Sequence, residues 1–352
     1  VGRLGEEGPI DAHVDDAAHL AIAEHILSDP LHPMRGGVFW GAHPEPIRAL
    51  NQPHLVFYLI ALALWISGGS LLAAQLALAL TVLPGIAAMT ALARHVFGAQ
   101  AAGKARLATV LVFLGPAFLP GQNLMCDATL LSLVCVALWA LATADGSPRR
   151  LAIAGLAVGL ACLVKYTALA LLPLFVVDAW LARTSRRLPV LLIPLAVLGL
   201  YALFNVADYG GVHVLGRDPG GVGEFDLLQR LGIVAARGAL FVLTLGAITL
   251  APAATAGITR RAAVALGAAF VALVIATRLC ATFGPAEMRD EPWTVTLFRT
   301  AFFLSGVVSI TLAARAADRK DRLDVLFESS AMLVAAFIVA LSPFVAVRHA
   351  LL

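Results

Sequence analysis

The segment "LAIAGLAVGLACLVKYTALALLPLF" (residues 151–175) decides the fold, because it is apolar on both sides of a single charge, Lys165. Each half is short for a hydrocarbon core of ~30 Å at ~1.5 Å per residue, so each needs a thinned or locally adapted bilayer to cross it. We therefore predict two membrane-spanning helices, at 151–164 and 167–182, that meet at a short loop around Lys165.

Apolar runs of this kind recur along the chain. Hydrophobic residues make up 60% of the sequence, charged residues 13%, and the mean hydropathy is +0.89. Soluble domains are about half apolar and about a quarter charged. In lipid, the backbone N–H and C=O groups of a segment must hydrogen-bond within that segment, and this requirement favours helices. We predict an all-α, polytopic transmembrane helical bundle. Its predicted spans are 71–93, 107–121, 128–144, 151–164, 167–182, 188–206, 232–256, 262–283, 294–314 and 323–345.

The basic residues indicate how this bundle is oriented. More than half of them lie in alternate loops, at 94–106, 149–150, 183–187, 260–261 and 315–322. Cytoplasmic loops are enriched in Lys and Arg, so these loops are predicted to be cytoplasmic. Residues 1–70 then form a long first extracytoplasmic loop, and 71–352 form the bundle. Within that loop, "PHLVFYLIALALWI" (53–66) is too short for a full span and is predicted to be an interfacial or re-entrant helix.

The first loop contains adjacent carboxylates in "HVDDAAHLAIAEHIL" (13–27). Helical spacing puts Ile26 and Leu27 on one face with Ala23, Leu20 and His19, which predicts an amphipathic helix that lies on the membrane or on other helices. Asp15 is a candidate N-cap of this helix. Asp15 and Asp16 are also candidate catalytic carboxylates, and the two roles are compatible.

A third carboxylate, Asp127, precedes the predicted span at 128–144 in "QNLMCDATL" (122–130). An ionisable residue at a membrane helix end is a functional candidate, although it also suits a helix cap. Lys165 and Arg348 fall at the extracytoplasmic ends of other spans. Such residues usually extend to lipid headgroups, and some bind phosphate.

Histidines are frequent in the first loop, at His13, His19, His25, His32, His43 and His54. They show no HxH or HExxH spacing, so the sequence identifies no metal ligands and leaves a divalent metal open as a cofactor. The four cysteines are scattered through apolar segments and suit small buried residues better than disulfides or metal ligands.

Four stretches resemble the membrane glycosyltransferases of the GT-C type, namely the bacterial relatives of protein O-mannosyltransferase and of the lipid A aminoarabinose transferase. They are "DDAAHLAIAEHIL" (15–27), "NQPHLVFYLIALALWISGG" (51–69), "MCDATLLSLVCVALWAL" (125–141) and the opening segment 151–175. In addition, "VRHALL" (347–352) resembles the start of a late Arg-Tyr-Leu-Leu-Pro motif. The chain departs from the family at Asn51 and Gln52, where aminoarabinose-transferase relatives have Glu-Lys.

The resemblance implies a reaction. A polyprenyl-phosphate sugar would donate its sugar, with inversion, to an acceptor on the extracytoplasmic face of the plasma (inner) membrane. Asp15 would be the general base, with Asp16 and Asp127 as further catalytic carboxylates. Sugar and phosphate binding would fall to Lys165, Tyr166, His19, His54 and Arg348. The implied partners are this donor, membrane lipid and an acceptor whose class (protein, lipid or glycan) stays open; no nucleic acid is expected.

Two other functions remain open from the sequence. A transporter for lipid or a small solute also carries intramembrane charges, usually near the midplane and within internal repeats. A non-catalytic membrane subunit with the same fold would tolerate the departure at Asn51 and Gln52. Because the sequence starts without Met and stops within an apolar run, we expect both ends to be truncated.

Overall fold

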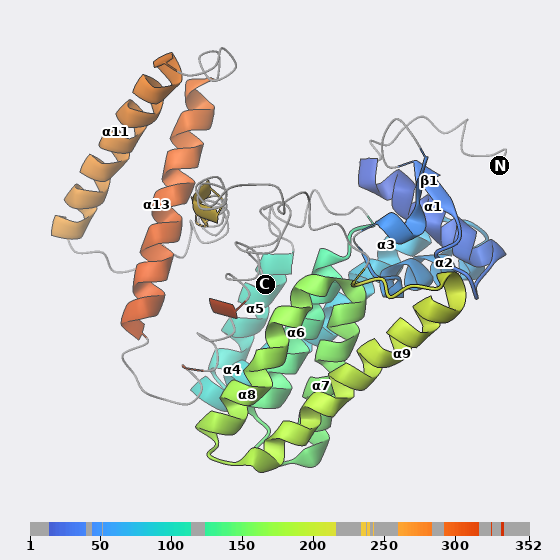
Figure 1. The fold of residues 1–352 in the computed structure, drawn as a ribbon. Coiled ribbons are helices and arrows are strands. Elements are labelled where there is room, and N and C mark those ends of the chain that lie inside the picture. Colours follow the sequence, from blue (N-terminus) through green and yellow to red (C-terminus); the bar gives the residue numbers. More distant parts are fainter. Residues whose placement is uncertain are drawn as a thin grey trace. The chain divides into compact units, whose positions relative to one another are not determined.

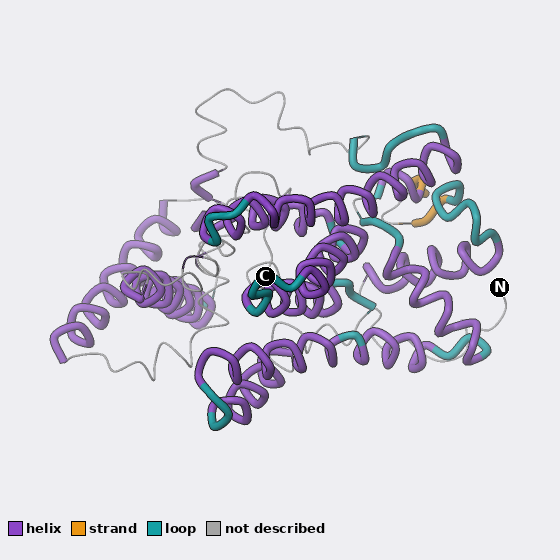
Figure 2. The backbone as a smooth tube through the Cα atoms, turned by 90° about the horizontal axis from the view of Figure 1, so that it is seen from below, coloured by secondary structure: helices purple, strands orange, loops and turns teal. Residues whose placement is uncertain are grey.

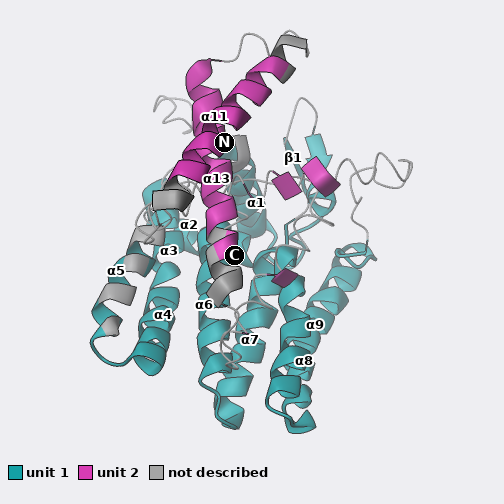
Figure 3. Ribbon diagram, turned by 90° about the vertical axis from the view of Figure 1, so that its left-hand side faces the viewer, with its two compact units in different colours: residues 1–218 teal, residues 219–352 magenta. Residues whose placement is uncertain are grey.

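A computed structural model describes residues 14–39, 44–50, 52–113, 124–215, 260–283 and 292–316, together with isolated positions between 234 and 333. These residues divide into two compact units, Val1–Asp218 and Pro219–Leu352 (Figure 3). Most of them are helical, which confirms the helical fold predicted from the sequence. The predicted division into an extracytoplasmic loop (1–70) and a membrane bundle (71–352) depends on the position of the membrane, and it stays a prediction.

The first unit begins with a helical layer that carries a small hairpin. Helix α1 (Val14–Ser28) packs on α2 (Leu55–Ser67), which packs on α3 (Leu71–Leu80) (Figure 1). Strands β1 (Gly37–Phe39) and β2 (Pro44–Pro46) pair antiparallel, with Val38 opposite Glu45, and the 3-10 turn η1 (Ile47–Ala49) follows. Within the described ranges this hairpin is the only strand pair (Figure 2), and it was not predicted from the sequence.

The helices that follow form a bundle. They are α4 (Val82–Phe97), α5 (Ala101–Phe113), α6 (Asp127–Ala142), α7 (Pro148–Val164), the 3-10 segment η3 (Tyr166–Leu171), α8 (Leu172–Leu181), the 3-10 segment η4 (Ser185–Leu191) and α9 (Leu192–Tyr209). Helix α6 contacts α4 and α7, and α7 contacts α9 (Figure 1).

Small residues allow the close contacts in this bundle. A Cβ added to Gly85 of α4 would lie 2.7 Å from the Ser132 Cα of α6, and the Gly85 N–H donates to Ser132 Oγ at 2.9 Å. A Cβ on Gly159 of α7 would lie 3.0 Å from the Val197 Cβ of α9. In lipid, where neighbouring tails are as apolar as leucine, such close backbone contact is a main source of helix association.

The contacts also fix which helix ends lie together. Thr81, just before α4, hydrogen-bonds through its hydroxyl to that of Thr129, near the start of α6, so α4 and α6 run parallel. Helices α7 and α9 run parallel too, because Gly155 lies against Ile193 and Gly159 against Val197. One end of the unit, here called the acidic end, therefore contains the start of α6 at Asp127 and the ends of α7 and α9. The opposite basic end carries Arg94, Arg149, Arg150, Arg183, Arg186 and Arg187.

The second unit is described for two long helices. Helix α11 (Arg260–Phe283) packs against α13 (Trp293–Ala316). The Arg278 guanidinium lies 4.3 Å from the centre of the Trp293 ring, which joins the end of α11 to the start of α13. The two helices therefore form an antiparallel hairpin.

Two described helical stretches are long and apolar enough to cross a membrane, Leu71–Phe97 and Ser185–Tyr209. Shorter apolar helices cover Leu55–Ser67, Asp127–Ala142, Tyr166–Leu181, Val264–Leu279 and Trp293–Val308. The first of these matches the short helix predicted at 53–66. The predicted spans at 232–256 and 323–345 lie largely outside the described residues, as does the second half of the span at 107–121.

Candidate functional site

Helix α1 is tied to the segment that leads into α6. The Asp16 Oδ1 accepts the Leu124 N–H at 2.9 Å, and the His19 Nδ1 donates to the Leu124 carbonyl at 2.8 Å. Both side chains are buried, and the His19 ring lies 5.1 Å from the Phe57 ring of α2. A buried backbone N–H and C=O are thereby satisfied by side chains distant in sequence. The first loop and the segment just before Asp127 are therefore held together by these two hydrogen bonds.

The details of α1 differ from the prediction. The helix begins at Val14, so Asp15 lies in its first turn and the predicted N-cap role of Asp15 is wrong. The side chain of Asp15 lies outside the described residues. The buried face contains His19, Ile22, Ala23 and Ile26, whereas Leu27 is 42% exposed. Leu27 was predicted to lie on the same face as His19 and Ile26, and this part of the prediction is wrong. The buried face of α1 is the one that packs on α2 and on the segment around Leu124, and it does not extend to Leu27.

Asp127 and Lys165 form a largely buried ion pair. The Lys165 Nζ lies 2.8 Å from the Asp127 Oδ1, with 14% and 4% of the two side chains exposed. Asp127 is the first residue of α6, where the helix dipole favours a carboxylate, and the N-cap position belongs to Cys126. Lys165 has extended backbone angles in the break between α7 and η3. The pair thus links the start of one helix to the end of its neighbour.

The next residue, Tyr166, is fully buried and anchors a second polar chain. Its hydroxyl hydrogen-bonds to the His213 Nδ1 at 2.6 Å, and the His213 Nε2 lies 2.8 Å from the Leu50 carbonyl. A carbonyl only accepts, so the Nε2 carries the proton and the Nδ1 accepts from the tyrosine. A neutral ring satisfies both bonds. His213 therefore joins η3 to the loop before α2.

His54 lies beside this chain and is also neutral. Its Nδ1 lies 2.9 Å from the Tyr201 hydroxyl, and its ring centre lies 6.0 Å from that of His213. Burial, and after it the neighbouring His213, lower the pKa of His54 to about 3. The ring would therefore offer a substrate hydrogen bonds rather than positive charge.

The end of α9 holds the first loop in place. Asp208 is buried and its Oδ2 accepts the Met34 N–H at 3.0 Å. The Arg35 Nε lies 3.2 Å from the Asp208 Oδ1 and donates to the Asp208 carbonyl at 2.8 Å. Asp208, Arg35, Tyr201 and His213 were not among the site residues predicted from the sequence. In the sequence, the one cue to Asp208 was its position two residues before Gly210, a glycine that could end a helix. In the structure Gly210 ends α9, with φ 80°.

The acidic end therefore brings together most of the residues predicted for the site. Asp16, His19, Asp127, Lys165, Tyr166 and His54 all lie there, whereas Arg348 lies outside the described residues. In the part of the chain that the structure describes, no three His, Cys, Asp or Glu side chains are grouped so as to hold a metal ion. The arrangement offers buried carboxylates, one lysine and neutral hydrogen-bonding rings.

Comparison with known proteins identifies a similar family and two similar solved structures. Residues 51–207 match the family described as dolichyl-phosphate-mannose-protein mannosyltransferase, which confirms the resemblance stated above. Two solved structures of ArnT from Cupriavidus metallidurans are similar at 16% identity. The one bound to undecaprenyl phosphate covers 94% of this chain and 72% of its own, with a TM-score of 0.43. The apo structure covers 93% and 72%, with a TM-score of 0.47. No curated protein matches.

Proposed function

We infer that the chain is a membrane glycosyltransferase of the GT-C type, because residues 51–207 match the dolichyl-phosphate-mannose-protein mannosyltransferase family. We propose that it uses a polyprenyl-phosphate sugar as donor, since the family description names a sugar carried on dolichyl phosphate. The acceptor would be bound at the acidic end, on the extracytoplasmic side. The single observation that carries the site is the convergence of α1, the start of α6 and the end of α7 at that end.

In the proposed reaction Asp15 acts as general base. It takes the proton from an acceptor hydroxyl, whose oxygen attacks the anomeric carbon of the sugar. The bond from that carbon to the phosphate oxygen breaks on the opposite face, and the lipid phosphate keeps the electron pair. The configuration at the anomeric carbon is inverted.

The contact of Asp16 supports a role for this residue that differs from the one proposed for Asp15. Because Asp16 accepts the Leu124 N–H, we assign it to positioning α1, next to the base, against the segment before Asp127. Asp127 holds Lys165 at 2.8 Å, so the lysine charge is fixed at the end of α7. In this position it would stabilise the negative charge that develops on the leaving phosphate.

The test is transfer from polyprenyl-phosphate mannose by the full chain in membranes. Loss of a general base lowers rates by roughly 10²–10⁴-fold, and we expect this for Asp15→Asn. Glu24→Gln is the matched control, because Glu24 is an exposed carboxylate of the same helix. Equal transfer by both variants would remove Asp15 from the mechanism. A wild-type chain that moves the labelled lipid without cleaving it would be a transporter, and one that does neither in an active assembly would be a non-catalytic subunit.

A further inference from the structure

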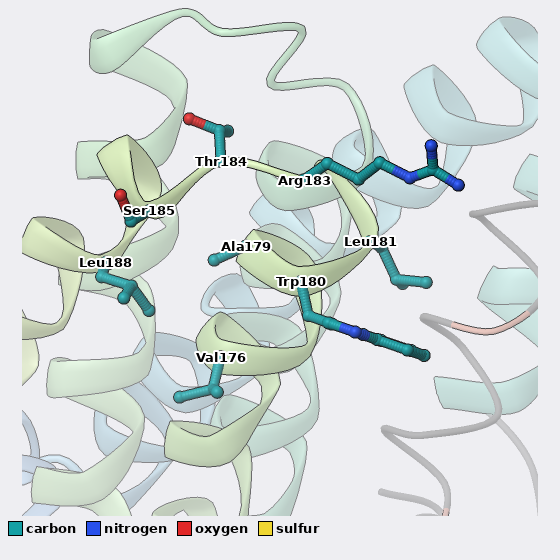
Figure 4. Close-up of a pocket in the computed structure, with 8 residues that line it drawn as sticks. All are labelled: Val176, Ala179, Trp180, Leu181, Arg183, Thr184, Ser185 and Leu188. Atoms are coloured by element: carbon teal, nitrogen blue, oxygen red, sulfur yellow. The ribbon is translucent and has the colours of Figure 1, made fainter.

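A pocket of about 610 Å³ lies at the basic end, where α8 turns into η4. Its lining combines apolar side chains with polar ones at the turn (Figure 4). The residues are Val176, Ala179, Trp180, Leu181, Arg183, Thr184, Ser185 and Leu188. Figure 4 shows Trp180, Leu181 and Arg183 extending to one side of the end of α8. Trp180 is 73% exposed, so a large amphipathic aromatic side chain stands beside a cation.

The charges around this pocket favour an anionic ligand. The buried Asp178 is paired with Arg187 at 2.9 Å, so these two charges offset one another. Arg183 and Arg186 are exposed, and neither forms an ion pair within the described residues. The turn therefore carries net positive charge next to an apolar surface.

The backbone at Arg183 is a second and independent observation. Helices α2, α4 and α9 each end at a glycine with positive φ, namely Gly68, Gly98 and Gly210. Helix α8 has Ala182 as its C-cap, and the residue that follows, Arg183, has φ 51°, a conformation that disfavours a side chain. The turn is closed by the Arg183 N–H on the Trp180 carbonyl and the Thr184 N–H on the Ala179 carbonyl, both at 3.0 Å. Among the described residues, Arg183 and Asp145 are the two non-glycine positions with positive φ, so this arginine occupies a backbone conformation that favours glycine.

We propose that this pocket binds one anionic phospholipid of the bilayer leaflet at the basic end. The lipid phosphate would contact Arg183, and an acyl chain would lie along Trp180 and Leu181. Basic pockets at the cytoplasmic ends of membrane helices suit acidic headgroups, and tryptophan suits the membrane interface. The site lies at the opposite end of the bundle from Asp127 and Lys165. The lipid site is therefore distinct from the proposed donor site, and the proposal of a lipid site does not depend on the proposed reaction.

The test uses Trp180 as the reporter. The full chain is placed in phosphatidylcholine vesicles that contain phosphatidylglycerol with brominated acyl chains, which quench nearby tryptophans. The Trp180 signal is the difference between wild type and Trp180→Phe. A basic residue near an anionic membrane surface contributes roughly fivefold to binding. We expect brominated phosphatidylglycerol to quench this signal at a concentration about fivefold lower than brominated phosphatidylcholine does.

Arg183→Gly is the decisive variant, because it relieves the positive φ and so is expected to fold at least as well as wild type. It should abolish the preference for the anionic lipid. Arg149→Gln, at an exposed arginine of the same end, should keep it. Equal quenching by both lipids in the wild type, or an unchanged preference in Arg183→Gly, would overturn the proposal. Loss of quenching on adding inorganic phosphate would assign the site to free phosphate and overturn it as well.

Discussion

Buried histidines at the acidic end work as neutral hydrogen-bonding groups. His213 satisfies Tyr166 on one side and the Leu50 carbonyl on the other, and His54 bonds to the Tyr201 hydroxyl. His213 uses both the acceptor and the donor capacity of an uncharged imidazole, whereas His54 bonds through Nδ1 alone. Protonation of either would place a charge in a site built for a neutral ring.

The pH dependence of stability should report on His54. Its pKa is about 3 in the folded chain and about 6.5 when exposed, so only the unfolded chain binds the proton between these values. Stability is therefore unaffected above about pH 6.5 and falls as the pH drops toward 3. From about pH 7 to about pH 4 we expect a loss of about 3 kcal/mol, measured by unfolding in detergent.

His54→Gln should lack this part of the pH dependence, whereas His95→Gln, at the exposed end of α4, should keep it. The result would contradict the expectation if both variants followed the wild-type profile.

The site residues could be predicted only in part from the sequence. Charged residues in an apolar chain are conspicuous, so Asp16, Asp127 and Lys165 were predicted. His213 was not, because its role depends on Tyr166 and Leu50, which approach it only after folding. The pairing of Lys165 with Asp127 depends on the antiparallel packing of α6 and α7. The sequence therefore predicted both residues as candidates but did not predict that they bind each other.

Among the helices, α7 and α9 show most clearly how composition sets packing. Gly155 and Gly159 lie one turn apart on α7 and both face α9. The apolar runs predicted both helices, but not the faces that meet. Nor did they predict the break at Thr81 between α3 and α4, which lies within one continuous apolar run. The hairpin at 37–46 was missed because its three-residue strands lack a strong periodic signal.

We expect Gly159→Ala to destabilise the chain by about 1–3 kcal/mol, because its Cβ would lie 3.0 Å from Val197 Cβ and 3.2 Å from Pro194 Cα. Gly199→Ala is the matched control within α9, because in the described part of the chain no heavy atom other than the nearby backbone of α9 lies within 4 Å of its added Cβ. That substitution should be neutral or slightly stabilising through helix propensity. Thermal unfolding of both variants in the same detergent makes the comparison, and equal midpoints would argue against close α7–α9 packing.

Across the first unit, contacts between its two sequence ends complete the acidic end. Met34 and Arg35 bond to Asp208, and Leu50 bonds to His213. These bonds hold the loop that precedes α2 against the end of α9. The apolar runs predicted the order of the helices, but this attachment required the three-dimensional positions of two loops.

Asp208→Ala should release this loop, because it leaves the buried Met34 N–H without its acceptor. Such a loss costs about 1–3 kcal/mol. Hydrogen exchange at the Met34 amide should accelerate, while exchange in α6 stays slow. Asp208→Asn keeps an acceptor oxygen and should have the smaller effect. If Asp208→Ala left Met34 fully protected, the bond would not hold the loop.

The attachment of Leu50 to His213 also sets an order for biogenesis. The two residues are 163 positions apart in the chain. At a synthesis rate of about 5–20 residues per second, the first loop emerges from the ribosome roughly 8–30 s before its partner. During that interval α9 has not yet been made, so the nascent loop cannot pack against it. The loop stays accessible to proteases and chaperones until translation has passed the end of the first unit.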